Sequence, residues 1–357
     1  MIRLAHRVAP KRERLFYGER SHLRACRSRL EGVSVRFRSF PFFPKIGSKY
    51  SLPLRDGLGC LYLLCILCGS HRGDILLVTN LLPLTHWMLF LLNGLFRRTV
   101  FVVLHGQMEA FLPNNPLGGT KPYFRLTKPL LKRDAHSRYV VLGEPIYREI
   151  ASLFSVRPIV IDHPYDFEEH IVADEPALPL RLGQIGVGNR GKGTEFLFAL
   201  AILLRDEIEA GQVEIHLVGR LDPELSAEMN PWVIYHREML SEEAFAREIA
   251  RLRYALFLRP AHVGRAVPSG SFFDAVKYGK PFLALDHPFI AHYAARFPGC
   301  GTICADTEAI AEAIRQRIAT REDAIAQQAA FARARQGLSI EAIAESFLEQ
   351  INSQPDR

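Results

Sequence analysis

The chain has 357 residues, enough at about 150 residues per domain for two domains with separate hydrophobic cores. Hydrophobic residues make up 48% of it and charged residues 23%, which excludes a disordered chain and a collagen-like or coiled-coil rod. The net charge of +7 is concentrated in residues 1–50, which hold 13 Lys and Arg against 3 Asp and Glu, whereas the rest of the chain holds 32 against 35. This basic segment suits an anionic membrane surface better than a nucleic acid. The rest of the chain is slightly negative, whereas a domain that reads nucleic acid would need a basic surface there.

The most apolar stretches, Leu58–Cys68 and Leu81–Phe96, are shorter than the roughly 20 residues of a membrane-spanning helix. We therefore expect no transmembrane segment, and the first residues lack the apolar core of a signal peptide. The pair Cys65 and Cys68 lies inside an apolar run and is interpreted as buried packing rather than as half of a zinc site. These features predict a cytoplasmic protein that is peripheral on the inner face of the membrane.

In the first half, an arginine-rich helix precedes Val33–Phe40, whose alternation of apolar and basic residues predicts an edge strand. From residue 56 helix-like and strand-like segments alternate, the pattern of a parallel sheet covered by helices. A Pro- and Gly-rich loop over 113–119 precedes the basic segment Lys121–Arg133. The expected helices are 56–68 and 84–95, and the expected strands are 74–79, 99–104, 138–142 and 158–162.

After an acidic linker, Glu168–Pro179, the same alternation begins again and predicts a second doubly wound α/β domain. Its expected strands are 180–185, 213–218, 255–258 and 281–285, and its expected helices are 194–204, 241–252, 271–278 and 307–318. A long helical region follows from 322 to 351. We therefore predict an α/β fold with Rossmann-like domains over 1–167 and 180–320, facing each other across a cleft, and a helical segment over 321–357.

Ligands of such domains bind at the carboxyl ends of the strands, so the loops that follow the strands are the candidate site. The first, Gly186–Gly193, contains Gly188, Arg190 and Lys192, and it suits a phosphate because glycines permit close approach and a helix begins there. It has neither dinucleotide nor P-loop spacing, and a simple strand-to-helix turn remains the alternative.

Two further loops of the second domain add candidate donor-binding residues. The strand Val213–Val218 leads into Gly219 and Arg220. The later loop contains Ser269, Gly270 and Ser271, whose hydroxyls are expected to cap the following helix while its N–H groups favour a phosphate. Asp274 lies one turn into that helix.

Residues 181–305 resemble the C-terminal half of GT-B glycosyltransferases, in particular the large retaining family that includes sucrose synthases and many bacterial polysaccharide transferases. The resemblance rests on Lys192-Gly193, on Gly219 and on the segment Phe273–Ala284, which reads Asp-Ala-spacer-Gly-x-Pro before an apolar strand. It implies that Asp274 replaces the glutamate that holds the donor ribose. Ala266 stands where the family has a second glutamate.

In the first half, His105 and Gly106 follow a buried strand, where the family often carries a histidine in the cleft. His105 and Glu109 are therefore the candidate catalytic residues, for contact with the transferred sugar and with an acceptor hydroxyl. A histidine that is merely hydrogen-bonded in a loop and an exposed carboxylate at a helix start are the alternatives.

The resemblance implies a hexosyltransferase, of retaining type, that moves a sugar from a nucleoside diphosphate to a saccharide or lipid-linked saccharide in polysaccharide biosynthesis. Arg190 and Lys192 are expected to neutralise the leaving diphosphate without a metal ion or other cofactor. Two alternatives stay open: a nucleotide-sugar epimerase of the same fold, and a catalytically degenerate relative that binds a sugar nucleotide or a membrane, which Ala266 favours.

Overall fold

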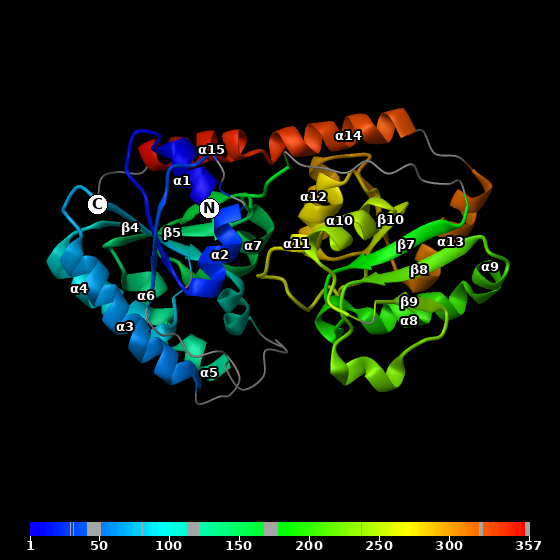
Figure 1. Cartoon of the computed structure of the whole chain (residues 1–357), viewed down its shortest axis with the longest axis horizontal. Coiled ribbons are helices and arrows are strands. Elements are labelled where there is room, and N and C mark those ends of the chain that lie inside the picture. Colours follow the sequence, from blue (N-terminus) through cyan, green and yellow to red (C-terminus); the bar gives the residue numbers. More distant parts are fainter. Residues whose placement is uncertain are drawn as a thin grey trace. The chain divides into compact units, whose positions relative to one another are not determined.

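The computed structural model describes residues 1–28, 30, 32–40, 51–79, 81–112, 121–167, 178–236, 238–320 and 324–353. The chain forms two compact units; in Figure 1 the first is coloured from blue to green and includes the red helix near the end of the chain, and the second is coloured from green to orange. Unit 1 consists of Met1–Pro164 together with Ile340–Arg357, and unit 2 is Tyr165–Ser339. The predicted segment 321–357 is thus divided between the two units. Most of the predicted linker, residues 168–177, lies outside the described residues, as does the predicted loop 113–119.

Unit 1 is built on a four-stranded parallel sheet with the strand order β3-β4-β5-β6. The strands are β3 (Ile75–Val78), β4 (Thr99–Leu104), β5 (Ser137–Leu142) and β6 (Ile159–Ile161). Nearly every side chain of β4 and β5 is buried, which is why these segments are continuous apolar runs. The helices of this part are α3 (Ser51–Gly69), α4 (Pro83–Phe96), α5 (Lys121–Arg125), α6 (Lys128–Arg133) and α7 (Glu144–Ile150), with short 3-10 helices η1 (Gly106–Phe111) and η3 (Ala151–Leu153).

The first forty residues form α1 (Ile2–Val8), β1 (Leu15–Gly18), α2 (Arg20–Ser28) and β2 (Arg36–Ser39). The predicted edge strand Val33–Phe40 is present in part as β2, which pairs in parallel with β1 in a separate two-stranded sheet and is therefore an edge strand there. Arg36 of β2 forms an ion pair with Glu13 at 2.7 Å, and the Arg27 guanidinium lies over the Phe37 ring. Part of the basic charge of this segment is therefore engaged within the protein.

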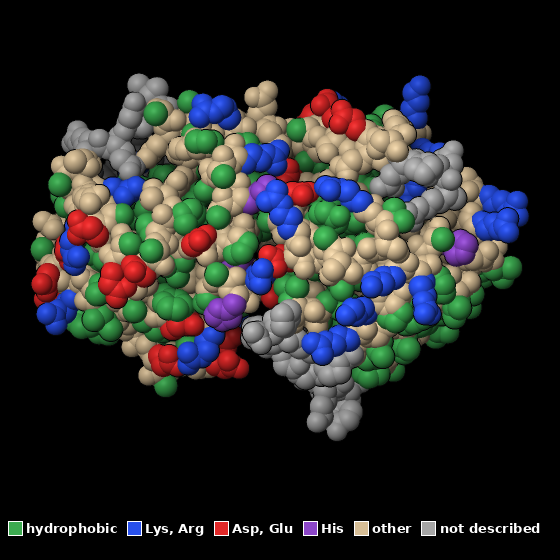
Figure 2. Space-filling model, turned by 180° about the vertical axis from the view of Figure 1, so that it is seen from behind, with side chains coloured by type: hydrophobic (Ala, Val, Ile, Leu, Met, Phe, Trp, Pro, Cys, Tyr) green, Lys and Arg blue, Asp and Glu red, His purple; other side chains and the backbone are tan. Residues whose placement is uncertain are grey.

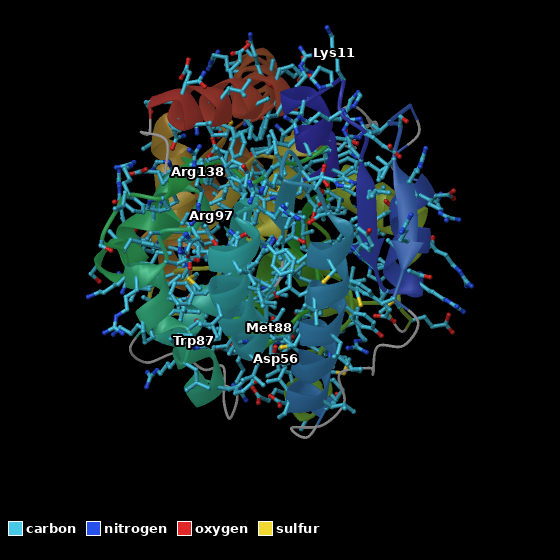
Figure 3. All side chains as sticks on the ribbon, turned by 90° about the vertical axis from the view of Figure 1, so that its left-hand side faces the viewer. Lys11, Asp56, Trp87, Met88, Arg97 and Arg138 are labelled. Atoms are coloured by element: carbon cyan, nitrogen blue, oxygen red, sulfur yellow. The ribbon has the colours of Figure 1, made fainter. Side chains whose placement is uncertain are left out.

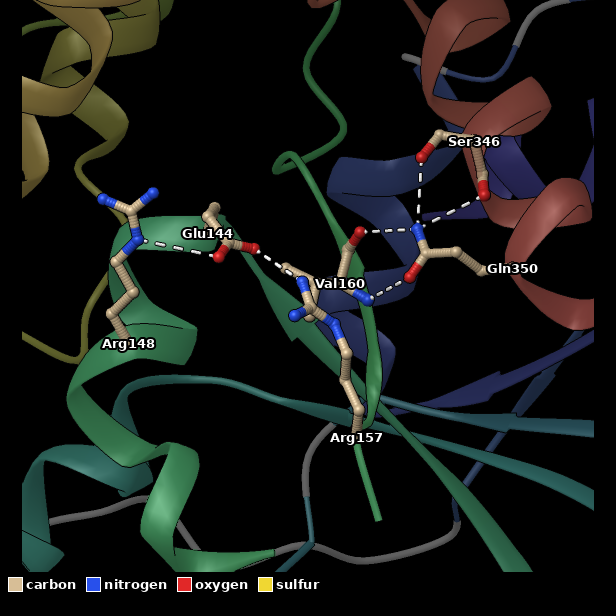
Figure 4. A network of polar contacts seen from close by, with 6 residues as sticks. All are labelled: Glu144, Arg148, Arg157, Val160, Ser346 and Gln350. Atoms are coloured by element: carbon tan, nitrogen blue, oxygen red, sulfur yellow. Dashed lines mark hydrogen bonds and ion pairs between the residues drawn. The ribbon is translucent and has the colours of Figure 1, made fainter. Parts of the chain in front are cut away.

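The last helix, α15 (Ile340–Ser353), returns to unit 1 and packs against α1 and β6. Its Gln350 side chain accepts a hydrogen bond from the Val160 N–H at 2.8 Å and donates one to the Val160 carbonyl at 2.7 Å (Figure 4). Because β6 is an edge strand, these two bonds replace those that a further strand would make. Ile343 and Phe347 of α15 join the core of the sheet, so the end of the chain completes the first unit.

Helices α3 and α4 lie side by side on unit 1, facing the viewer in Figure 3. Asp56 of α3 is fully buried, and its carboxylate accepts hydrogen bonds from the N–H groups of Leu84 and Thr85, both at 2.7 Å. It also accepts from the hydroxyls of Thr85 and Tyr123, each at 2.6 Å. The N-cap residue of α4, Leu82, has no capping side chain, so Asp56 caps this helix from its neighbour.

The prediction that no segment is long enough to span a membrane is wrong for α3. This helix has 19 residues and is apolar enough to cross a membrane, by length and composition alone. The apolar run begins only at Leu58, but the helix begins at Ser51 and includes the buried Asp56, which is hydrogen-bonded to α4.

Unit 2 contains a six-stranded sheet in which every pair is parallel, with the order β12-β11-β10-β7-β8-β9. The strands are β7 (Leu180–Ile185), β8 (Val213–Val218), β9 (Val233–Tyr235), β10 (Tyr254–Phe257), β11 (Phe282–Leu285) and β12 (Gly301–Cys304). The helices are α8 (Thr194–Leu203), α9 (Arg205–Glu209), α10 (Glu242–Ala250), α11 (Gly270–Lys277), α12 (Pro288–Arg296), α13 (Thr307–Ala319) and α14 (Ala324–Gly337), with 3-10 turns η4 (Arg190–Lys192) and η5 (Pro223–Glu228). Both units are therefore α/β with parallel sheets, as predicted.

We expect Asp56→Asn to lower the free energy of unfolding by about 2–4 kcal/mol, because the amide keeps one acceptor oxygen and turns an N–H donor toward groups that are themselves donors. Urea denaturation followed by circular dichroism measures this loss. The matched control is Asp74→Asn, an exposed carboxylate that accepts one hydrogen bond from the His71 N–H, for which about 0.5 kcal/mol or less is expected. Equal losses in the two variants would contradict the capping role.

Candidate functional site

The order of strands in unit 2 places a pocket at the carboxyl edge of its sheet. Strands β7 and β10 are neighbours, and the chain leaves them toward opposite ends of the sheet. In doubly wound sheets such a reversal opens a crevice in which ligands bind. A pocket lies there, lined by residues from the ends of both strands and from the loops that follow, namely Gln184, Ile185, Lys192, Leu256, Phe257, Leu258, Arg259, Ser269, Ser271, His287, Phe289 and Ile290.

The loop after β7 positions Lys192 over its own backbone. The Lys192 ammonium donates to the Ile185 carbonyl at 3.0 Å. Gly186 has a φ of +92°, and a Cβ there would lie 2.4 Å from the Lys192 Nζ, so only glycine leaves room for the ammonium. Gly193 also has positive φ, and its Cβ would lie 2.0 Å from the Leu258 carbonyl oxygen at the end of β10. The glycines thus bring the loops after β7 and β10 into contact.

Buried polar side chains hold this loop in place. Gln184 of β7 donates to the Lys192 carbonyl at 2.8 Å and accepts from the Thr194 hydroxyl at 2.7 Å. The Asn189 side chain accepts from the Lys192 N–H at 2.9 Å. These bonds fix the backbone on both sides of the lysine before any ligand arrives.

Arg259 was not among the residues predicted for the site, although it follows directly on the apolar run of β10. It lines the pocket with Lys192, and the two positive charges are close enough to interact. Burial, followed by the charge of Arg259, lowers the pKa of Lys192 to about 8, and Asp274 partly opposes this shift. Two neighbouring, partly buried cations are unfavourable in the absence of a counter-charge, so this site is suited to bind an anion.

The N-terminus of α11 supplies further donors to the same pocket. Ser269 occupies the N-cap position, as predicted, but its hydroxyl does not cap the helix and instead lies 3.2 Å from the Ser271 hydroxyl. The N–H groups of Gly270 and Ser271 in the first turn therefore have no side-chain cap. Helix N-termini of this kind favour phosphate groups.

Asp274 of α11 accepts a hydrogen bond from the hydroxyl of Tyr165, the first residue of unit 2. The Tyr165 ring stacks on Phe273, with the ring centroids 5.6 Å apart and the planes inclined by 19°. The carboxylate that the family resemblance assigned to the ribose is therefore held by a tyrosine from outside the predicted domain 180–320. Sequence spacing did not indicate this partner, which lies 109 residues away.

His287, also missed by the sequence analysis, is a buried neutral histidine at the back of the pocket. Its Nδ1 accepts from the Phe289 N–H at 3.2 Å, so its Nε2 carries the proton and donates to the Val263 carbonyl at 2.9 Å. Burial lowers its pKa to about 4, despite the bond to the Val263 carbonyl, which raises it. Because both ring nitrogens are already bonded, His287 shapes the pocket and caps α12 rather than transferring protons.

Of the residues predicted to bind the donor, Lys192, Ser269 and Ser271 line this pocket. The others do not, namely Gly188, Arg190, Gly219, Arg220, Gly270 and Asp274. Arg190 is half exposed and forms an ion pair with Glu228. Gly188 accepts at its carbonyl from the Asp222 N–H and donates to the Arg220 carbonyl, so it links the loops after β7 and β8 through the backbone. Gly219 follows β8 with a φ of +148°, and the Arg220 side chain is exposed.

In unit 1, His105 and His163 lie at the ends of β4 and β6 with their ring centroids 6.4 Å apart. Burial lowers the pKa of both rings, that of His163 to about 4. Glu109 lies in η1 and is 2% exposed, so the interpretation of an exposed helix-start carboxylate is wrong. Among the described residues, no three His, Cys, Asp or Glu side chains are grouped so as to hold a metal ion.

No protein-family model matches the chain, and no curated protein matches it in sequence. Solved structures match its fold. HepE from Anabaena, in complex with UDP and glucose, has a TM-score of 0.65 and 16% identity over 98% of this chain and 95% of that one. WaaG, a glycosyltransferase involved in lipopolysaccharide biosynthesis, has a TM-score of 0.58 and 15% identity over 95% and 99% of the two chains. TarM has a TM-score of 0.61 and 15% identity over 84% of this chain, which spans only 58% of TarM.

These likenesses and the two doubly wound units define the class of fold: the chain has the GT-B fold. The family resemblance inferred from residues 181–305 is thereby confirmed at the level of fold.

We expect the affinity for a nucleoside diphosphate, with UDP as the probe, to fall about tenfold between about pH 7 and pH 9, because Lys192 loses its proton near pH 8 instead of at its usual pKa of 10.5. Isothermal titration calorimetry across this range measures the effect. Lys192→Met, which keeps the length of the side chain and removes the charge, should bind UDP one to two orders of magnitude more weakly and without this dependence on pH. A flat profile for the unmodified protein would remove Lys192 from the anion site.

We expect Tyr165→Phe to weaken UDP binding about tenfold, since it keeps the stacking on Phe273 but removes the hydroxyl that orients Asp274. Tyr235→Phe, in the same unit but outside the pocket, is the control and should bind normally. Tighter binding by Tyr165→Phe would show that the tyrosine competes with the nucleotide, and unchanged binding would show that its hydroxyl does not support the site.

Proposed function

We propose that this protein is a glycosyltransferase that moves a sugar from a nucleoside diphosphate to a saccharide or lipid-linked saccharide. One observation carries the proposal: Lys192, Arg259 and the N-terminus of α11 converge on one pocket at the strand reversal of unit 2. A diphosphate has the charge and acceptor oxygens that such a group of donors binds.

In the proposed reaction, the bond between the anomeric carbon of the sugar and the β-phosphate oxygen breaks, and a bond to the acceptor oxygen forms. The electron pair of the broken bond stays with the diphosphate, and the acceptor hydroxyl releases its proton to the solvent. Negative charge therefore grows on the leaving group in the transition state. Lys192 and Arg259 are positioned to stabilise it, and because the loop is held in place by Gln184 and Asn189, little reorganisation is required.

We assign the diphosphate contact to Lys192 and Arg259 rather than to Lys192 and Arg190, because Arg190 is engaged by Glu228 outside the pocket. The charge of these two side chains and the N–H groups of α11 would serve in place of a divalent cation, so we propose that transfer needs no metal. Asp274, oriented by Tyr165, would accept the ribose hydroxyls.

The identity of donor and acceptor is proposed from the similar structures. HepE was solved with UDP and with UDP-glucose, which favours a UDP-hexose as donor. WaaG acts in lipopolysaccharide biosynthesis, and polysaccharide biosynthesis is the process we propose for this chain. We further propose retention of anomeric configuration, with His105 contacting the sugar or the leaving phosphate. Glu109 was expected to contact the acceptor, but it is 2% exposed, so we assign it no acceptor contact.

The test is a screen of the purified protein against UDP-, GDP- and dTDP-hexoses by thermal shift, followed by release of the nucleoside diphosphate in the presence of alkyl glycoside acceptors. We expect a UDP-hexose to raise the melting temperature and UDP release to require the acceptor and to persist in excess EDTA. Arg259→Met should lower donor affinity by one to two orders of magnitude, while Arg190→Met serves as the matched control and should leave it unchanged.

Three results would contradict the proposal. Release of free sugar and UDP without an acceptor would support the epimerase alternative. Binding of sugar nucleotides without turnover on any acceptor would support a degenerate relative. Loss of affinity in Arg190→Met but not in Arg259→Met would assign the second diphosphate contact to Arg190 instead of Arg259.

A further inference from the structure

The outer surface of α3 is an apolar stripe. Its exposed residues recur every three or four positions, as one face of a helix requires, and none is charged. Leu61 is 58% exposed, and the side chains of Cys65 and Cys68 are exposed free thiols, so the expectation that these cysteines are buried is wrong. Only 17% of the most apolar window of this helix is buried.

Helix α4 continues this apolar surface beside α3 (Figure 3). Leu84, Leu91 and Leu95 are exposed, the last at 76%, and with Met88 they follow the i, i+4, i+7, i+11 spacing of one helix face. Leu126 is also half exposed, and its carbonyl accepts from the Trp87 indole at 2.9 Å. We name the exposed side chains of α3 and α4, together with Leu126, the leucine face.

Positive charge borders the leucine face at both ends. Arg98 donates to the Ser70 carbonyl at 2.6 Å, which joins the carboxyl ends of the two helices, and exposed Arg72 and Arg97 lie at this end. The basic segment that follows Leu126 includes exposed Lys128. Figure 2 shows unit 1 on the right, with Lys and Arg side chains over much of its surface and apolar side chains along the outer edge.

Acidic side chains do not balance these cations at the surface. Residues 51–138 contain 10 Lys and Arg but 4 Asp and Glu. Three of the four acids, Asp56, Glu109 and Asp134, are buried. The exposed charge around the leucine face is therefore predominantly positive.

The arginines of the first segment are a weaker basis for membrane contact than the sequence alone indicates. The Arg14 guanidinium donates to the Ala9 carbonyl at 2.6 Å, Arg12 donates to the Gly73 carbonyl at 2.6 Å, and Arg36 is paired with Glu13. These groups would have to break internal contacts to reach a lipid headgroup.

We propose that the leucine face docks on an anionic lipid bilayer, with its leucines at the level of the upper acyl chains and the flanking cations at the headgroups. Exposed leucines suit the acyl region of such a bilayer, and the cations that border them suit its anionic headgroups. A spanning orientation of α3 would break the four buried hydrogen bonds of Asp56, so the helix lies along the surface instead. The proposal does not depend on the reaction at the pocket of unit 2.

The test is co-sedimentation of the full chain with vesicles of phosphatidylcholine alone and with one part in three of phosphatidylglycerol. We expect binding to the anionic vesicles, reduced at least tenfold in Leu91→Glu/Leu95→Glu. The matched control places two glutamates on exposed apolar residues of unit 2, Ile202→Glu/Met239→Glu, and should bind normally. Arg72→Asn/Arg97→Asn should lower the partition coefficient by about fivefold per cation, and asparagine tolerates the positive φ of Arg97.

A second measurement reports contact at the surface itself. Vesicles should slow the reaction of Cys65 and Cys68 with a maleimide, and Cys65→Ala/Cys68→Ala removes the protected signal. Binding that is equal for both lipid mixtures, or that survives Leu91→Glu/Leu95→Glu, would overturn the proposal. So would a leucine-dependent dimer in light scattering without vesicle binding, which would make a second copy the occupant. UDP binding of all variants should be unchanged, which separates this outcome from failure of the proposed function.

Discussion

The reversal of strand order between β7 and β10 is the constraint on which the candidate site depends. Because the chain leaves these neighbouring strands in opposite directions, the connections that follow them diverge at the carboxyl edge between them. Lys192 from one strand end and Arg259 from the other meet in that gap, and the N-terminus of α11 faces it. Burial, followed by the charge of Arg259, lowers the pKa of Lys192, and an anionic ligand would oppose both effects.

Unit 1 depends on side chains that complete the backbone hydrogen bonding of a neighbouring element. Asp56 supplies the cap that α4 lacks, and Gln350 occupies the open edge of β6. In each case a side chain that is distant in sequence makes hydrogen bonds that a neighbouring residue or strand would otherwise make. Asp56 thereby links α3 to α4, and Gln350 links α15 to the sheet. With the polar groups of α3 satisfied on its inner side, its outer face is left wholly apolar, and the leucine face follows from that arrangement.

Much of the fold was predictable because its buried parallel strands are continuous apolar runs separated by helical segments. The strands Thr99–Leu104, Leu180–Ile185 and Val213–Val218 have the predicted bounds to within a residue. The two-stranded sheet of β1 and β2 was not predicted, since four residues of mixed polarity in each strand carry no signal for the partner they pair with. The capping of α4 by Asp56 was not predicted either, because this contact joins residues of two helices that are 28 or more positions apart in sequence.

By itself, the sequence determined that two parallel α/β units are present and that glycine-rich and serine-containing strand ends form the site, because hydrophobic periodicity and strand-end position are local properties. It identified Lys192 for this reason. Only the tertiary structure decided that Arg259 rather than Arg190 lines the pocket and that Tyr165 holds Asp274, since these are pairings between side chains. It also decided that Cys65 and Cys68 are exposed, because an apolar run is the same in sequence whether its outer face meets a core or the surface.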